Sequence, residues 1–194
     1  MKPQFPVVFI VLVLAIGSCK QSNLVYEKPY FDFDSLIHTQ VKSRSVQQKT
    51  IFKVAAINSQ KDSSSFKADS ALLAHEWDAF LQLDVINKPM YKNNYEISER
   101  ADDKSNLTIR SYQAKIPSSV PYVHFYYHGS FANLKRIESK YVEKNVLNDI
   151  ARLLTMTLDE EQGKPFIQKY SITGGQKMIF NDTVQFSIQG SISH

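Results

Sequence analysis

The longest apolar run of the chain lies at its start and is too short to cross a membrane as a helix. It covers the 11 residues 7–17 (VVFIVLVLAIG), whereas a spanning helix needs roughly 20 residues. Lys2 precedes the run, and small residues follow it. This order is typical of a secretory signal peptide, so we expect the residues after it to form the fold.

The apolar run ends in Gly17, Ser18 and Cys19, the only cysteine of the chain. This ending resembles the lipobox of bacterial lipoproteins, in which small residues precede an invariant cysteine. The resemblance covers residues 1–19. It implies cleavage between Ser18 and Cys19 and acylation of Cys19, both on its thiol and on the new amino terminus. The alternative is a chance thiol at the end of an ordinary signal peptide or membrane anchor.

The lipobox resemblance also implies a location and a domain plan. In bacterial lipoproteins an Asp after the cysteine favours the inner membrane, and an acidic run favours surface display. Residues 20–23 (KQSN) contain no acid, so we expect an outer-membrane lipoprotein on the periplasmic face. The plan is a signal peptide over 1–18, a lipidated Cys19 with a tether over 19–30, and a single domain over 31–194. As a whole, the chain is similar to uncharacterised lipoproteins of the Bacteroidetes.

The charge of the chain excludes one class of partner. There are 23 Lys and Arg against 19 Asp and Glu, and loss of Lys2 with the signal peptide leaves 22 against 19. This excess is too small for a nucleic-acid-binding surface. We therefore expect no nucleic acid as a partner. The expected partners are the lipid bilayer through acylated Cys19, an envelope protein complex, or an apolar ligand.

The first half of the predicted domain favours two helices and one strand. Asp32 or Asp34 can cap a helix that continues to about residue 44, and Asp69 or Ser70 can cap a second helix over 71–85. The second helix carries an apolar stripe of Leu73, Trp77, Phe80 and Leu81, interrupted by Asp84. Residues 50–57 alternate as a strand, with Phe52, Val54 and Ala56 on one side. Residues 58–65 (NSQKDSSS) predict a hairpin tip or a surface loop.

The second half favours strands. Strands are predicted over 95–98, 107–115, 122–128 and 135–142, and a three-stranded meander over 170–190, in which Gly174 and Gly175 mark a bulge or turn. Residues 146–158 fit both a helical stripe and a strand, and we favour a strand over 151–159. The expected fold class is α+β. A predominantly antiparallel, curved sheet of about six to eight strands would carry two helices from the N-terminal half on one face.

The candidate site residues lie on the strand that is predicted over 122–128. Tyr122, His124, Tyr126 and His128 would share one face. The favoured interpretation is a half-exposed sheet face, and the alternative is a ligand-contacting surface. On a strand His124 and His128 would be about 13 Å apart, too far for one metal ion. No catalytic motif, metal site or cofactor site is predicted.

The remaining titratable groups favour a solvated role. His75, Glu76 and Asp78 are expected on the solvent side of the second helix, and Asp102 and Asp103 in an exposed turn.

Three functions remain open from the sequence. The first is a non-catalytic binding or scaffolding lipoprotein of the cell envelope. The second is a periplasmic carrier of lipid or another apolar ligand, and the third is an unrecognised hydrolase. A carrier would keep an apolar cavity between helix and sheet, whereas a scaffold would fill that space with Trp77 and Phe80.

Overall fold

The structure is a computed structural model, and it describes residues 26–161, 163–179 and 182–193. The predicted signal peptide, its cleavage position after Ser18 and the lipidated Cys19 lie outside these residues. Of the helices that the structure describes, none combines the length and the apolarity that a transmembrane helix requires.

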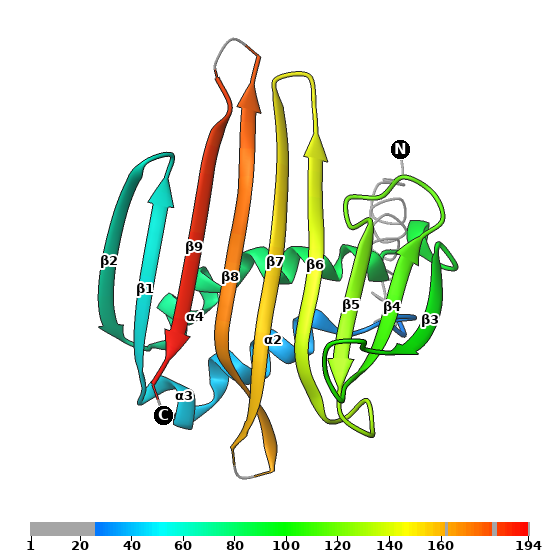
Figure 1. Ribbon diagram of the computed structural model, residues 1–194, viewed down its shortest axis with the longest axis horizontal. Helices are drawn as coiled ribbons and strands as arrows, with labels where there is room; N and C mark the ends of the chain where they lie inside the picture. The colour runs from blue at the N-terminus through cyan, green and yellow to red at the C-terminus, as the bar shows by residue number, and fades with distance from the viewer. Residues whose placement is uncertain (1–25, 162, 180–181, 194) are drawn as a thin grey trace, which may run out of the picture.

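One antiparallel sheet of nine strands accounts for most of the described chain. Its order is β2-β1-β9-β8-β7-β6-β5-β4-β3, so the strands from β3 to β9 form a continuous meander and the β1–β2 hairpin adds to its end through β9 (Figure 1). The strands are β1 (Thr50–Ile57), β2 (Gln60–Lys67), β3 (Tyr95–Ala101), β4 (Thr108–Ala114), β5 (Tyr122–Tyr127), β6 (Leu134–Lys144), β7 (Asn148–Glu161), β8 (Lys164–Met178) and β9 (Val184–Ile192).

Short helical segments cover one face of this sheet. They are α2 (Phe33–Lys42), α3 (Arg44–Gln47), α4 (Ser70–Glu76), α5 (Asp78–Leu81) and the 3₁₀ segments η2 (Gln82–Asn87) and η3 (Pro89–Tyr91). Figure 1 shows α2 and α4 running across the strands on the far side of the sheet, and the ends of β8 and β9 extending beyond α4. We call the side with the helices the helix face and the other side the open face.

The expected fold class is therefore wrong. The structure is 52% strand and 20% helix, and its sheet is neither closed nor strongly curled, in contrast to the predicted α+β fold with a curved sheet of six to eight strands. One cause is the segment predicted as a loop or hairpin tip, because only Asn58 and Ser59 form the turn and Gln60–Lys67 forms the edge strand β2. Apart from Phe66, which is partly buried against the core, this strand is polar and exposed, a composition that blunts an exposed edge.

Both predicted helix starts are confirmed, and the side-chain hydrogen bonds choose between the alternative caps. Asp32 accepts from the backbone N–H of Ser35 at 2.8 Å, and Asp69 accepts from that of Leu72 at 2.8 Å. The predicted single helix over 71–85 is wrong, however, because α4 ends at Glu76 and is followed by α5 and η2.

Asp84, the polar residue that interrupts the apolar stripe of the predicted second helix, joins this helical layer to α2. The Asp84 carboxylate accepts from the backbone N–H of Phe33 at 3.1 Å and lies 2.9 Å from the Lys28 ammonium. Asn87 donates to the Phe31 carbonyl and accepts from the N–H of Tyr30. Within the predicted tether, Lys28 and Tyr30 thus contact the folded body.

The two longest strands settle the ambiguous segments. Residues 148–161 form β7, which confirms the strand favoured there. The predicted three-stranded meander is wrong, because this region forms two strands, β8 and β9, which pair with each other. Gly174 and Gly175 lie inside β8 and do not mark a turn. Gly174 is needed for a close approach, since a Cβ there would come within 2.2 Å of the Ala151 carbonyl oxygen.

The core lies between the helices and the sheet. Trp77, Phe80 and Leu73 of the α4–α5 layer and Phe33 and Ile37 of α2 are almost completely buried against sheet residues. In β1 the inward residues are Ile51, Lys53 and Ala55. Phe52, Val54 and Ala56 share the other side, as predicted, and Phe52 is exposed on the open face.

Gly190 gives room for one buried aromatic ring. It pairs with Tyr170 across β8 and β9 on the helix face, and a Cβ at this position would lie 2.1–2.4 Å from atoms of the Tyr170 phenol. The ring of Tyr170 therefore lies over the backbone of Gly190.

We expect Gly190→Ala to lower the free energy of unfolding by about 1–3 kcal/mol, the usual range for overpacking. Gly175→Ala is the matched control in the same sheet, since its Cβ meets only the flexible Gln185 amide at 3.1 Å and should cost less. Urea denaturation of both variants measures the difference. Equal midpoints for the two variants would show that Tyr170 does not need this space.

Candidate functional site

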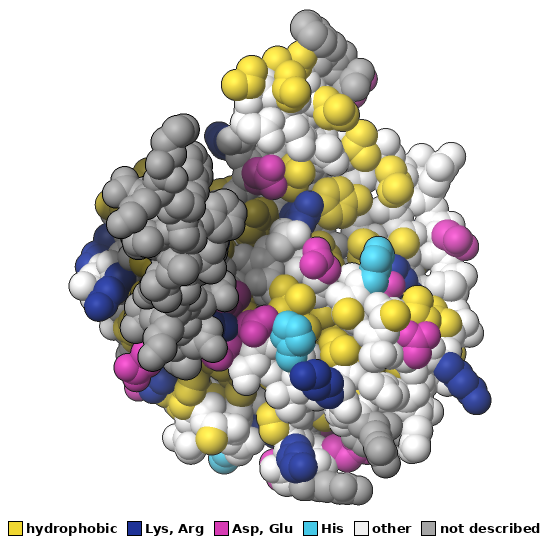
Figure 2. Space-filling view, turned by 180° about the vertical axis from the view of Figure 1, so that it is seen from behind, with side chains coloured by type: hydrophobic (Ala, Val, Ile, Leu, Met, Phe, Trp, Pro, Cys, Tyr) yellow, Lys and Arg dark blue, Asp and Glu magenta, His cyan; other side chains and the backbone are white. Residues whose placement is uncertain are grey.

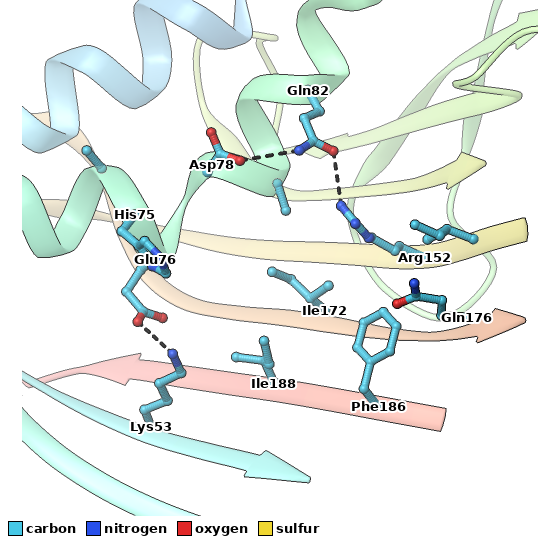
Figure 3. Close-up of a pocket in the computed structure, with 13 residues that line it drawn as sticks. Lys53, His75, Glu76, Asp78, Gln82, Arg152, Ile172, Gln176, Phe186 and Ile188 are labelled. Carbon is cyan, nitrogen blue, oxygen red and sulfur yellow. Dashed lines mark hydrogen bonds and ion pairs between the residues drawn. The ribbon is translucent and has the colours of Figure 1, made fainter. Parts of the chain in front are cut away.

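A cleft of about 590 Å³ opens on the helix face, between the α4–α5 layer and the strands that extend beyond it (Figure 3). One wall is formed by the helical layer, and the other is formed by the sheet. The helical wall consists of Ala74, His75, Glu76, Asp78, Ala79 and Gln82, and the sheet wall of Lys53, Ile150, Arg152, Ile172, Gln176, Phe186 and Ile188.

A three-residue network closes the end of the cleft next to β1. The Glu76 carboxylate lies 2.6 Å from the Lys53 ammonium and accepts a hydrogen bond of 2.7 Å from the Tyr170 hydroxyl. Only 8% of the Glu76 side chain is exposed. Burial and the adjacent Glu76 carboxylate raise the pKa of Tyr170, so its hydroxyl stays protonated and donates.

Arg152 of β7 extends into the middle of the cleft and has a different kind of partner. Its guanidinium donates to the Gln82 side-chain oxygen at 3.0 Å, and the Gln82 amide in turn donates to Asp78 at 3.3 Å (Figure 3). Among the described residues, no carboxylate lies within ion-pair distance of Arg152. A half-buried guanidinium with a neutral partner retains donors for an anion.

The sheet wall around Arg152 is apolar. Ile172 and Ile188 face each other across β8 and β9, and Phe186 lies opposite Gly174. Figure 3 shows the side chains of Ile172, Ile188 and Phe186 pointing into the space below the helical wall. The cleft therefore offers one cation beside an apolar surface, a combination that fits an amphipathic anion.

A second groove of about 710 Å³ lies beside α2 and the start of β8 and has apolar residues such as Phe31, Leu36 and Phe166 in its lining. Its buried amide is used internally, because Gln40 donates to the Pro165 carbonyl at 2.7 Å and accepts from the Ile167 N–H at 3.1 Å. Although this groove is larger, its polar groups hold α2 onto β8, and we interpret it as a structural joint.

The four site residues predicted from sequence lie around β5, away from the cleft. Tyr122 and His124 stack at 4.7 Å between ring centroids on the open face, and the Tyr126 hydroxyl donates to Glu138 at 2.8 Å. His128 follows the end of β5, where its backbone N–H bonds to the Asn133 carbonyl. The strand therefore brings three of the four residues to one face, and His128 is separate.

His124 has a hydrogen-bond partner within the sheet, and its lowered pKa favours the neutral imidazole. Its Nδ1 lies 2.9 Å from the Ser111 hydroxyl, and burial lowers its pKa despite the opposing effect of Glu138. The register places His124 in one row with Glu138, Thr155 and Ser171, on the side of the sheet opposite Glu76. His124 and Glu76 therefore do not form one site.

One expectation for the helix and turn residues needs revision. Glu76 was expected on a solvated face and is instead buried, whereas His75 and Asp78 are exposed at the cleft rim. Asp102 and Asp103 lie in or beside an exposed turn as predicted, and the Asp102 carboxylate accepts from the Ser105 hydroxyl at 2.7 Å.

Two residues of the cleft, Lys53 and Arg152, were not predicted from the sequence. A signal was available for each, since both are charged residues at inward positions of apolar, alternating strands.

The described residues contain no group of three or more His, Cys, Asp or Glu side chains placed to hold a metal ion. Comparison with known proteins adds no assignment: no protein family, no curated protein and no solved structure matches the chain.

We expect the partly buried Lys53–Glu76 pair to stabilise the fold only as a pair. Glu76→Leu should lower the free energy of unfolding by about 3 kcal/mol, because it leaves the Lys53 charge without its partner. The double variant Lys53→Met/Glu76→Leu removes both charges and should recover most of this loss. Urea denaturation measures each value.

The control for this cycle is the exposed pair of Arg100 and Asp103, at 3.6 Å. Asp103→Ala should change the free energy of unfolding by less than about 1 kcal/mol. A double variant at 53 and 76 that is no more stable than Glu76→Leu would contradict the assignment of the cost to the unpaired Lys53.

Proposed function

We propose that the protein is a lipid-anchored binding module of the bacterial cell envelope, held by acylated Cys19 at the periplasmic face of the outer membrane, that binds an amphipathic anion in the cleft. The observation that carries the ligand proposal is Arg152, a half-buried guanidinium bonded to the neutral Gln82 side chain beside an apolar sheet wall. The lipobox resemblance of residues 1–19 supports the anchor.

The chemistry of the cleft favours binding over catalysis. Both oxygens of the Glu76 carboxylate have partners, one in Lys53 and one in Tyr170. A carboxylate held in this way is not free to take a proton from a substrate. The Tyr170 hydroxyl stays protonated, because its raised pKa disfavours the phenolate. Arg152 remains as a donor that can bind and orient a ligand.

The packing of the helical layer favours a binding module over an enclosing carrier. Trp77 and Phe80 are almost completely buried and fill the centre of the space between helix and sheet. An apolar ligand would have to displace them, whereas the cleft beside them is already open. The module thus binds at the side of the core.

We expect Cys19 to carry the anchor. Cells fed a labelled palmitate analogue should incorporate it into the wild-type protein and not into Cys19→Ser, because acyl transfer requires the thiol. Mass spectrometry of the purified protein locates the modification. The anchor proposal fails if the wild-type protein incorporates no label and keeps residues 1–18.

We expect Arg152 to determine anion binding in the cleft. Dodecanoate, below its micellar concentration, should bind the full chain carrying Cys19→Ser, and Arg152→Gln should weaken binding about tenfold or more, since a charge-assisted hydrogen bond contributes roughly 1.5–3 kcal/mol. Acetate, which has the same head group and no chain, should bind much more weakly. Isothermal titration calorimetry measures all three affinities.

The matched control is Arg136→Gln on the open face, where the guanidinium lies 3.1 Å from Glu138 and 3.8 Å over the Tyr126 ring. This variant should bind dodecanoate as the parent protein does. Equal affinities for the two Arg variants would place the probe outside the cleft.

A further inference from the structure

A compact apolar surface lies at the ends of two neighbouring hairpins, the β6–β7 and β8–β9 hairpins. Large apolar side chains are exposed there, in contrast to the buried ones that form the core. We call this surface the hairpin tip, and it consists of Val146 (85% exposed), Leu147 (67%), Ile179 (51%), Met178 (48%) and Val184 (39%). Figure 2 shows hydrophobic side chains gathered at this protruding end of the molecule.

The two hairpins form one surface because they are hydrogen-bonded to each other. The backbone N–H of Ile179 donates to the Leu147 carbonyl at 3.2 Å, and Asn148 pairs with Met178 at the ends of β7 and β8. Exposed apolar patches on such projecting elements indicate a protein or membrane contact.

The apolar surface continues from the hairpin tip into the cleft. Val184 pairs with Gln176 and Gln176 with Ile150, so these three residues lie in one row on the helix face. Phe186 is two residues further along β9, on the same side of the sheet. Figure 2 shows hydrophobic side chains extending from the protruding end towards the centre of this face. The open side of the cleft thus faces the hairpin tip.

The start of the described chain lies within reach of this end of the sheet. Tyr26 and Tyr141 line the same shallow depression, and Tyr141 lies three residues before the end of β6 at Lys144. The seven residues from Cys19 to Tyr26 span at most about 24 Å. From Tyr141 to the level of Val146 the sheet rises about 17 Å. A lipid on Cys19 can therefore reach the level of the hairpin tip.

We propose that the hairpin tip inserts into the interface of the bilayer that holds the anchor, so that the cleft opens towards the lipid. The inference takes the lipid anchor from the proposed function and adds an orientation. Membrane-surface elements bury apolar side chains about 5–10 Å deep, which matches two or three residues at a hairpin end. A stable dimer needs roughly 800 Å² per partner, more than five side chains at a narrow end provide.

A dye at the hairpin tip tests the orientation. The full-length lipidated protein carrying Leu147→Cys has one free thiol, because acylation occupies Cys19. After labelling with a polarity-sensitive dye and reconstitution into phosphatidylethanolamine–phosphatidylglycerol vesicles, we expect emission at shorter wavelength and quenching by spin-labelled lipid. The matched control is a dye on Ile97→Cys in the edge strand β3, where Ile97 is 51% exposed; this dye should show neither change.

Two results would overturn the proposal. The first is a dye at residue 147 that behaves as the dye at residue 97 does. The second is a shift of the emission to shorter wavelength without vesicles, together with a doubled mass by light scattering, which shows self-association. A failed anchor is seen separately, as Cys19 without lipid in the mass spectrum. The dye is then placed on Cys19→Ser/Leu147→Cys, which has a single thiol, and its emission after vesicles are added decides the contact of the hairpin tip.

In the anchored protein, the variant Leu147→Asp/Ile179→Asp should remain folded, because both side chains are exposed. It should lose the protection from proteolysis that vesicles give to the hairpin tip of the wild-type protein. Equal protection of the variant and the wild-type protein would also contradict insertion.

Discussion

The packing of a short helical layer on one face of a long sheet determines the rest of the structure. Trp77 and Phe80 fix the layer at the middle of the strands, where they are buried against the sheet. Strands β7 and β8 have 14 and 15 residues, and each rises roughly 3.3 Å per residue. The layer is narrower than these strands are long, so part of the helix face stays uncovered. The cleft and the hairpin tip both lie on this uncovered part.

The charged residues between the helical layer and the sheet have two different roles. Lys53 and Glu76 neutralise each other where the helix meets β1, and Tyr170 completes the network because Gly190 leaves room for its ring. Removing one partner of such a pair costs more than replacing both. Arg152 lies further along the strands and bonds to a neutral amide. The first group therefore holds the layer in place, and Arg152 keeps binding capacity.

Local signals in the sequence predicted the elements that depend on neighbouring residues. Asp32 and Asp69 begin helices because a side-chain oxygen satisfies a free backbone N–H within the same turn. The alternation over 151–159 predicted β7 for a similarly local reason. The strand β2 was missed because Phe66 is its single apolar residue, so the segment has no apolar period. Gly174 was interpreted as a turn because its cause, the nearby carbonyl of Ala151, comes from another strand.

The cleft and the hairpin tip were not predicted from the sequence for a related physical reason. Each depends on contacts that its residues do not make: Arg152 has no carboxylate partner among the described residues, and the apolar residues of the hairpin tip are not covered by the helices. In the sequence alone, a lysine or arginine at an inward strand position only interrupts the apolar pattern. The structure shows the partners: Lys53 lies beside Glu76, and Arg152 bonds to the Gln82 amide. In the sequence alone, apolar residues such as Val146 and Leu147 fit a buried strand or helix. In the structure they are exposed, because the long strands extend beyond the helices. Charges at inward positions and apolar residues at turn positions are therefore the sequence features that point to the surfaces of this fold.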